Sequence, residues 1–165
     1  MFSFPNPVNE KAARVVAGVV AVAGLIILAT GAHWLLIPVA YGFWARVLTG
    51  PTLSPLARIA MKVAPGEPTY VPGPPKRFAQ GMGAAITSAA AVLWLAGAIT
   101  AAEILVAALV VAATLESAFA FCLGCQIFGG LMRIGLIPDA ICVECADIRL
   151  ARGRPVPAGH RPSRP

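Results

Sequence analysis

All four cysteines of the chain form two CxxC pairs near its C-terminus, at Cys122 and Cys125 and at Cys142 and Cys145. The resulting pattern, C-x2-C-x16-C-x2-C, lies within the spacing expected of a four-cysteine zinc site. Zn²⁺ in a structural site takes four thiolates in a tetrahedron, and a four-cysteine iron–sulfur cluster has the same ligand count. The spacing therefore predicts a metal site as one alternative.

Thiol chemistry is a second reading of the same residues, because a CxxC dithiol can cycle to a disulfide and a thiolate can carry a sulfane sulfur. Such reactivity needs a lowered thiol pKa, usually from a helix N-terminus or a nearby cation. A helix ending at Cys122 would oppose the thiolate, whereas a break at Gly124 and a new helix near Cys125 would favour it. Packing of free cysteines as small apolar side chains is the third reading.

Glu116 lies within the last long apolar stretch, where a carboxylate is costly and often functional. On a regular helix Cys122 and Cys125 would lie about 240° and 180° around the axis from it, which argues against direct contact. We expect Glu116 to be protonated or to pair inside the helical bundle, with Thr87, Ser88 or His33 as partners.

The composition is that of a membrane protein. Of 165 residues, 58% are hydrophobic and 12% are charged, whereas about a quarter of the residues in a soluble domain are charged. The net charge is +6, but the cations cluster at the ends of apolar blocks and not on an amphipathic surface. This distribution argues against a nucleic-acid partner and favours a lipid bilayer.

Four apolar segments predict transmembrane helices at about residues 15–30, 34–48, 78–99 and 104–123. A span needs about 20 helical residues, so the first two segments are short, and together they are too long for one span. The second block follows the first at once, which favours a retained span over a cleaved signal peptide. We therefore expect an all-α integral membrane fold with four transmembrane helices as two helical hairpins, in a single domain over residues 1–150.

The segments between and after these hairpins have their own signatures. Residues 53–63 predict an interfacial helix whose cations, Arg58 and Lys62, share a face toward lipid headgroups. The following stretch, APGEPTYVPGPP, is too rich in proline and glycine for helix or sheet. The basic tail at 151–165 has little to bury and predicts disorder.

The basic residues also predict the orientation. Every Lys and Arg precedes the first span, lies between the second and third, or follows the fourth, while the opposite turns hold His33 and Glu103. Since Lys and Arg near span ends stay in the cytoplasm, both termini and the cysteines should face the cytoplasm. Permanent structural disulfides are not expected in that reducing compartment.

Four stretches carry a family resemblance: PVNEKAAR, GPPKRFAQ, FCLGCQIF and CVECADI. Over roughly residues 5–150 the chain resembles a family of bacterial integral membrane proteins, domain of unknown function 4395, whose most specific feature is FCLGC at the end of a span. The resemblance implies a location in the bacterial inner membrane. It also implies an association with thioredoxin-like and sulfurtransferase-like proteins, which would favour sulfur or thiol traffic.

The expected function is thiol redox or sulfane-sulfur handling at the cytoplasmic membrane face, with Cys122 and Cys125 as the working pair and Cys142 and Cys145 as the resolving or docking pair. The competing reading is a non-catalytic membrane subunit in which Zn²⁺, held by all four cysteines, fixes the C-terminal segment. A small sulfur-anion transporter is a weaker alternative. The expected partners are a cytoplasmic thioredoxin-like or sulfurtransferase-like protein and a larger membrane complex or homo-oligomer.

Overall fold

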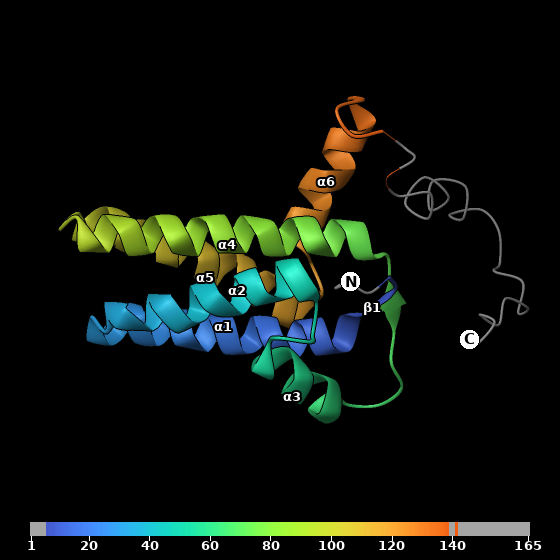
Figure 1. Ribbon diagram of the computed structural model, residues 1–165, viewed down its shortest axis with the longest axis horizontal. Helices are drawn as coiled ribbons and strands as arrows, with labels where there is room; N and C mark the ends of the chain where they lie inside the picture. The colour runs from blue at the N-terminus through green and yellow to red at the C-terminus, as the bar shows by residue number, and fades with distance from the viewer. Residues whose placement is uncertain (1–5, 139–140, 142–165) are drawn as a thin grey trace, which may run out of the picture.

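The computed structural model describes residues 6–138 and 141, so the predicted tail at 151–165 lies outside the described residues. The described chain is mostly helical (Figure 1). Its elements in order are β1 (Val8–Asn9), α1 (Glu10–Thr30), the 3₁₀ turn η1 (His33–Leu35), α2 (Leu36–Thr49), α3 (Pro55–Val63), β2 (Tyr70–Val71), α4 (Gly73–Leu95), α5 (Ile99–Phe119) and α6 (Leu123–Arg133).

Within the described residues, three helices are long and apolar enough to cross a membrane: α1, α4 and α5. They hold 21, 23 and 21 residues, and at 1.5 Å per residue each reaches the ~30 Å thickness of a hydrocarbon core. The predicted second span forms η1 and the 14-residue α2, which is only about 21 Å long. The membrane character is confirmed, and a fourth span stays a prediction.

The helices pack lengthwise into a bundle in which α1 lies mainly against α5, and α4 lies between α2 and α5 (Figure 1). Although α1 and α2 are joined by a short turn, each packs chiefly on a helix from the second half of the chain. The first predicted hairpin therefore has little interface of its own. What holds its two helices in place is the second half of the bundle.

Small side chains fill much of the interior, and many large apolar side chains lie on the outside. The buried residues include many alanines: Ala12, Ala17, Ala21, Ala84, Ala90, Ala102 and Ala113. On α1 alone, Val22 and Leu25 are each more than half exposed. In lipid the hydrophobic effect does not favour burial of large side chains between helices. Small residues stabilise the interfaces there because they let the helices approach closely. This inverted distribution is consistent with a lipid environment.

Two short strands tie the starts of α1 and α4 together, because β1 and β2 pair antiparallel, with Val8 opposite Val71. The Asn6 side chain also accepts a 2.8 Å hydrogen bond from the backbone N–H of Gly73. The expectation that the Pro- and Gly-rich segment excludes sheet was wrong at Tyr70–Val71. Such a segment cannot build a sheet alone, but two residues can pair with a neighbouring extended chain.

The helix predicted at about residues 53–63 is present as α3 (Pro55–Val63), and its interfacial position stays a prediction. Ser54 caps it by accepting a hydrogen bond from the Ala57 N–H. It buries Ala57 and Ala60, packs on α1, and leaves Ile59 and Met61 exposed among its cations. An exposed face that mixes apolar side chains with cations suits a headgroup layer.

The last helix, α6, leaves the bundle near the start of α4 and projects away from it (Figure 1). Its docking depends on Gly124, where an added Cβ would lie 2.6 Å from both the Cα and the Cβ of Ala79 on α4. Phe128 packs alongside, with its ring 5.6 Å from that of Phe78. The middle glycine of the first CxxC pair is thus a helix-packing residue and does not break the chain.

We predict that Gly124→Ala will destabilise the protein by about 1–3 kcal/mol, because the methyl group must push α6 away from the α4 backbone. Gly129→Ala is the matched control on the same helix, since a Cβ there meets no atom within 4 Å. The control should be neutral or stabilising by about 0.5–1 kcal/mol. Unfolding of the detergent-purified protein followed by circular dichroism measures both, and equal effects would contradict the close packing.

Candidate functional site

Cys122 lies at the N-cap of α6, beyond the end of the last span-length helix. The helix α5 ends at Phe119 because Ala120 adopts a left-handed conformation with φ 56°. The predicted span at 104–123 was therefore too long at its C-terminal end. The Sγ atom of Cys122 accepts a 3.3 Å hydrogen bond from the backbone N–H of Cys125, as a serine or aspartate does in an ordinary N-cap.

This geometry separates the acidities of the two thiols. A hydrogen bond from the Cys125 side chain is the main cause that lowers the pKa of Cys122, although burial opposes it. The same hydrogen bond, together with burial, raises the pKa of Cys125. Among the nearby charges, Glu116 raises the pKa of Cys122, and Lys76 lowers it by a smaller amount. Cys122 is therefore the more acidic thiol of the pair.

Lys76 forms an ion pair with Glu116 at the base of this site, with 2.7 Å between its Nζ and the Oε1 of Glu116. The side chains are 7% and 16% exposed. The pair links the first turns of α4 to the last turn of α5, next to the chain reversal that leads to Cys122. A buried ion pair of this kind is sensitive to the loss of either member.

The partners expected for Glu116 were wrong. Thr87 donates to the carbonyl of Gly83 and Ser88 accepts from the Trp44 indole. His33 lies in the turn after α1, where its Nε2 is 3.5 Å from Glu103 Oε1. The argument from a regular helix also failed at Ala120, because the reversal there brings Cys122 back toward Glu116, and both line one cavity of about 160 Å³.

A second cavity, of about 340 Å³, opens beside the two thiols. Lys76, Cys122, Cys125 and Gln126 line it, with Phe128 on the α6 side. Cys122 itself is buried and Cys125 is half-buried. The two cysteines and Lys76 therefore line one common cavity.

Arg14 caps the end of α5 from the neighbouring helix. Its Nε and Nη2 donate to the carbonyl of Ser117 at 3.0 and 2.9 Å, and Nη2 also donates to that of Ala118 at 3.1 Å. These carbonyls carry the negative end of the α5 dipole. Arg14 offsets that charge close to the chain reversal that precedes Cys122.

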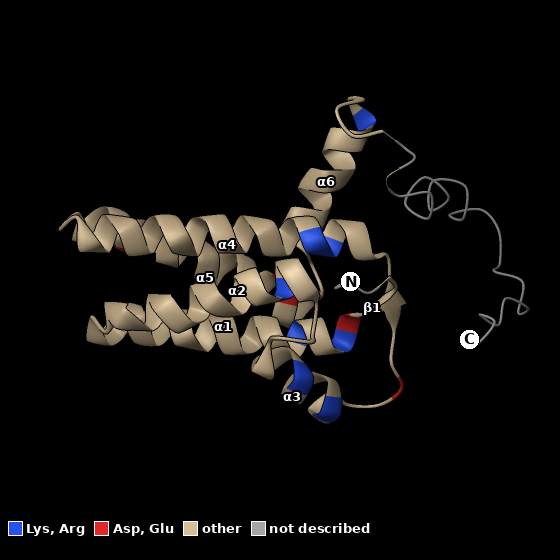
Figure 2. Ribbon diagram, in the orientation of Figure 1, with Lys and Arg blue, Asp and Glu red and all other residues tan. Residues whose placement is uncertain are grey.

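Apart from Arg133 at the far end of α6, the described cations gather at the end of the bundle where α1 and α4 begin and α2 ends (Figure 2). Glu103 lies at the opposite end, close to His33. Cys142 and Cys145 lie outside the described residues, so the fold of the second CxxC pair is not described. Within the described ranges, no three His, Cys, Asp or Glu side chains gather as metal ligands.

Sequence reasoning missed the structural roles of Lys76 and Arg46, because it assigned every cation to the headgroup level. Both are only 6% exposed. The sequence did contain a signal for Lys76. Glu116 is a carboxylate within the last apolar stretch and favours a cation as its partner, and Lys76 lies in the first turn of α4, which packs on α5. For Arg46 the signal was weaker, since its hydrogen-bond partner is the neutral Gln80.

We predict that Lys76→Met will cost about 3–5 kcal/mol of stability, because Glu116 is left buried without its cation. The double variant Lys76→Met/Glu116→Leu should recover most of that loss, since two apolar side chains of similar volume can replace a buried pair. Lys62→Met, an exposed lysine on α3, is the control and should change stability little. Denaturant unfolding in detergent measures all three, and an unrecovered double variant would contradict the pairing.

The comparisons with known proteins give a family and no function. A family model described as a domain of unknown function, DUF4395, matches residues 8–133. No curated protein and no solved structure matches the chain. The matched region covers all the described helices, from the start of α1 to the end of α6. On this match the chain belongs to the DUF4395 family.

Proposed function

We propose that Cys122 and Cys125 form a reactive dithiol that exchanges electrons or sulfur with a thiol partner at the cytoplasmic face of a bacterial inner membrane. The observation that carries the proposal is the hydrogen bond from the Cys125 N–H to Cys122 Sγ at the N-terminus of α6. Reactive cysteines are found at helix N-termini near a cation, because both stabilise the thiolate. Cys122 has both features, and Lys76 is the cation.

In the redox form of this proposal, the Cys122 thiolate attacks one sulfur of a partner disulfide. A mixed disulfide forms, and the partner's other sulfur leaves as a thiolate. The Cys125 thiol then loses its proton and attacks Cys122 Sγ, which expels the second partner thiolate and leaves a Cys122–Cys125 disulfide. Two electrons pass to the partner, and a dithiol protein of the thioredoxin type restores the reduced pair.

Sulfur transfer would use the same nucleophile. The Cys122 thiolate takes the outer sulfur of a donor persulfide, the donor leaves as a thiolate, and Cys122 carries the persulfide to an acceptor. The cavity beside the thiols gives a sulfur donor access to Cys122. In the redox form Cys125 resolves the mixed disulfide, so Cys142 and Cys145 serve there as the docking pair, and in sulfur transfer they act as a resolving or docking pair.

Zinc bound by all four cysteines is the competing proposal, in which the metal fixes the C-terminal segment and the protein is a non-catalytic subunit. Metal analysis separates the two ideas. About one zinc per chain, lost when Cys142 and Cys145 become serine, would support the zinc site and count against a free dithiol.

We predict that Cys122 will be alkylated well below the pH at which an ordinary cysteine, with a pKa near 8.5, becomes reactive. Cys125→Ala should shift the pH–rate curve of Cys122 upward, because it removes the side-chain donor that lowers the pKa of Cys122. Iodoacetamide rates followed by peptide mass spectrometry measure this. Cys125→Ser is the matched control, which keeps a hydroxyl donor and should shift the curve less.

An ordinary thiol titration at Cys122 in the wild-type protein would overturn the proposal. So would a Cys125→Ala curve that coincides with the wild-type one. Persulfide or disulfide mass shifts on Cys122 after treatment with a donor would then tell sulfur transfer from redox exchange.

Four spans with cytoplasmic termini form the topological part of the proposal, supported by the cations at one end of the bundle (Figure 2). We predict that a membrane-impermeant maleimide will label Ala98→Cys in intact cells and leave Glu67→Cys unlabelled until lysis. Both positions are exposed, in the α4–α5 turn and in the loop before β2. The reverse labelling pattern would place the dithiol on the oxidising side.

A further inference from the structure

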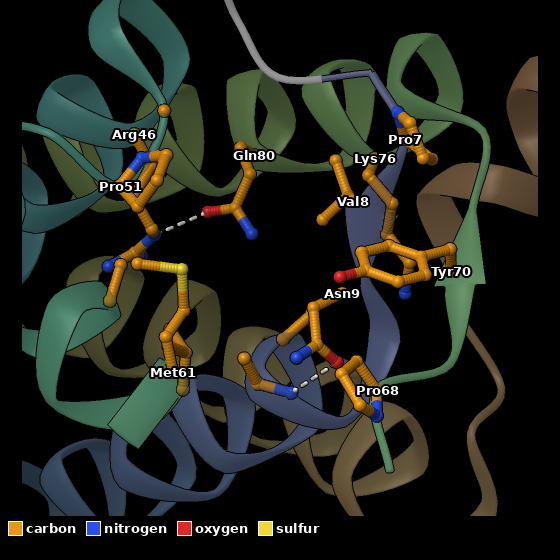
Figure 3. Close-up of a pocket in the computed structure, with 15 residues that line it drawn as sticks. Pro7, Val8, Asn9, Arg46, Pro51, Met61, Pro68, Tyr70, Lys76 and Gln80 are labelled. Carbon is orange, nitrogen blue, oxygen red and sulfur yellow. Dashed lines mark hydrogen bonds between the residues drawn. The ribbon is translucent and has the colours of Figure 1, made fainter. Parts of the chain in front are cut away.

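A separate cavity of about 370 Å³ lies at the cation end of the bundle, enclosed by α1, α2, α3 and α4 and by the short β1–β2 ladder. Figure 3 shows Arg46 and Gln80 on one side of this space, with Tyr70 and Asn9 across it. The cavity does not include either described cysteine. Its volume falls in the range of small-molecule sites.

Arg46 lines this cavity, and one of its guanidinium nitrogens lacks a hydrogen-bond partner among the described residues. Its side chain is buried, with 6% exposed. Nε donates to Gln80 Oε1 at 2.7 Å, and the guanidinium stacks on the Phe43 ring at 4.7 Å. Among the described residues, Nη2 is buried and has no hydrogen-bond partner. A buried donor of a charged group without a partner is costly, and a bound acceptor would remove that cost.

The charges around the cavity favour an anion. Arg46 and Lys76 both line it, and no carboxylate from the described part of the chain does. Lys76 is balanced by Glu116, whereas Arg46 has no acidic residue within ion-pair distance among the described residues. One net positive charge is therefore left at a buried position beside an open volume.

The rest of the lining is mainly apolar, with Val8, Val16 and Met61 and several prolines and alanines. A bare inorganic ion would leave this apolar surface in contact with water. A molecule with one anionic head group and a short apolar body would satisfy both the guanidinium and the walls.

We propose that this cavity binds a small organic anion, whose carboxylate or phosphate pairs with Arg46 and whose apolar body lies against Met61 and Val16. The head group can belong to a soluble metabolite or to a phospholipid. The site stands independently of the dithiol, although Lys76 lines both cavities.

Hexyl phosphate is a suitable probe, with hexanol as its uncharged analogue and inorganic phosphate as its head group alone. Thermal unfolding of the detergent-purified full chain should show a saturable rise in midpoint of about 5 °C with hexyl phosphate at a hundredfold excess over its Kd. Hexanol should give no rise, and inorganic phosphate a weaker one.

Two variants locate the effect. Arg46→Gln should weaken hexyl phosphate binding at least tenfold. Met61→Glu should do the same by placing a carboxylate at the cavity wall, and as Met61 is exposed it should fold even if Arg46→Gln does not. Ile59→Glu is the matched control, with the same charge change on an exposed face of α3 that does not line the cavity. It should bind within about twofold of wild type.

Absence of a saturable rise would overturn the inference, and so would equal weakening in Met61→Glu and Ile59→Glu, which indicates only diffuse surface charge. Native mass spectrometry of protein taken directly from membranes identifies the source. A retained phospholipid that is lost in Met61→Glu assigns the head group to lipid. Binding of hexyl phosphate without a retained lipid assigns it to a soluble anion.

Discussion

The arrangement of the site depends on the buried ion pair between Lys76 and Glu116. It joins two helices at the point where the chain reverses toward α6, so it fixes the start of that helix relative to the bundle. It also sets the local charge. A carboxylate alone would oppose a thiolate at Cys122, and a lysine alone would carry a full desolvation cost. As a pair each offsets the cost of burying the other's charge, and at Cys122 Glu116 raises the thiol pKa more than Lys76 lowers it.

The packing of the bundle around this pair suits lipid, in which burying large apolar side chains between helices gains little free energy. Alanine and glycine are common at the helix interfaces, beside a few larger side chains such as Ile27 and Leu36, and many valines, leucines and isoleucines face outward. Close backbone approach then supplies the attraction that side-chain burial supplies in water. Gly83 illustrates this, because a Cβ there would collide with the Phe43 ring. Among the described residues, the buried Arg46 and Lys76 lie near the cation end, whereas His33 is buried at the opposite end.

The long helices were predictable from the sequence, because runs of apolar residues between polar turns are a strong and local signal. The end of α5 was not, since Ala120 has no sequence mark of the left-handed conformation it adopts. The partners of Glu116 and Arg46 depend on helices that meet 40 and 34 residues apart in the chain. Spacing identified the cysteine pair, but the helix that begins at Cys122 decides its acidity, and that helix is set by the contact between Gly124 and α4.

The N-cap role of Cys122 couples a conformational event to a chemical one. The backbone N–H of Cys125 donates to Cys122 Sγ, so one hydrogen bond both caps the first turn of α6 and stabilises a negative charge on the sulfur. By thermodynamic reciprocity, ionisation of the sulfur tightens that turn, and anything that unwinds the turn raises the proton affinity of the sulfur. A molecule that binds the projecting end of α6 and unwinds its first turn would therefore raise the pKa of Cys122 without contacting the sulfur.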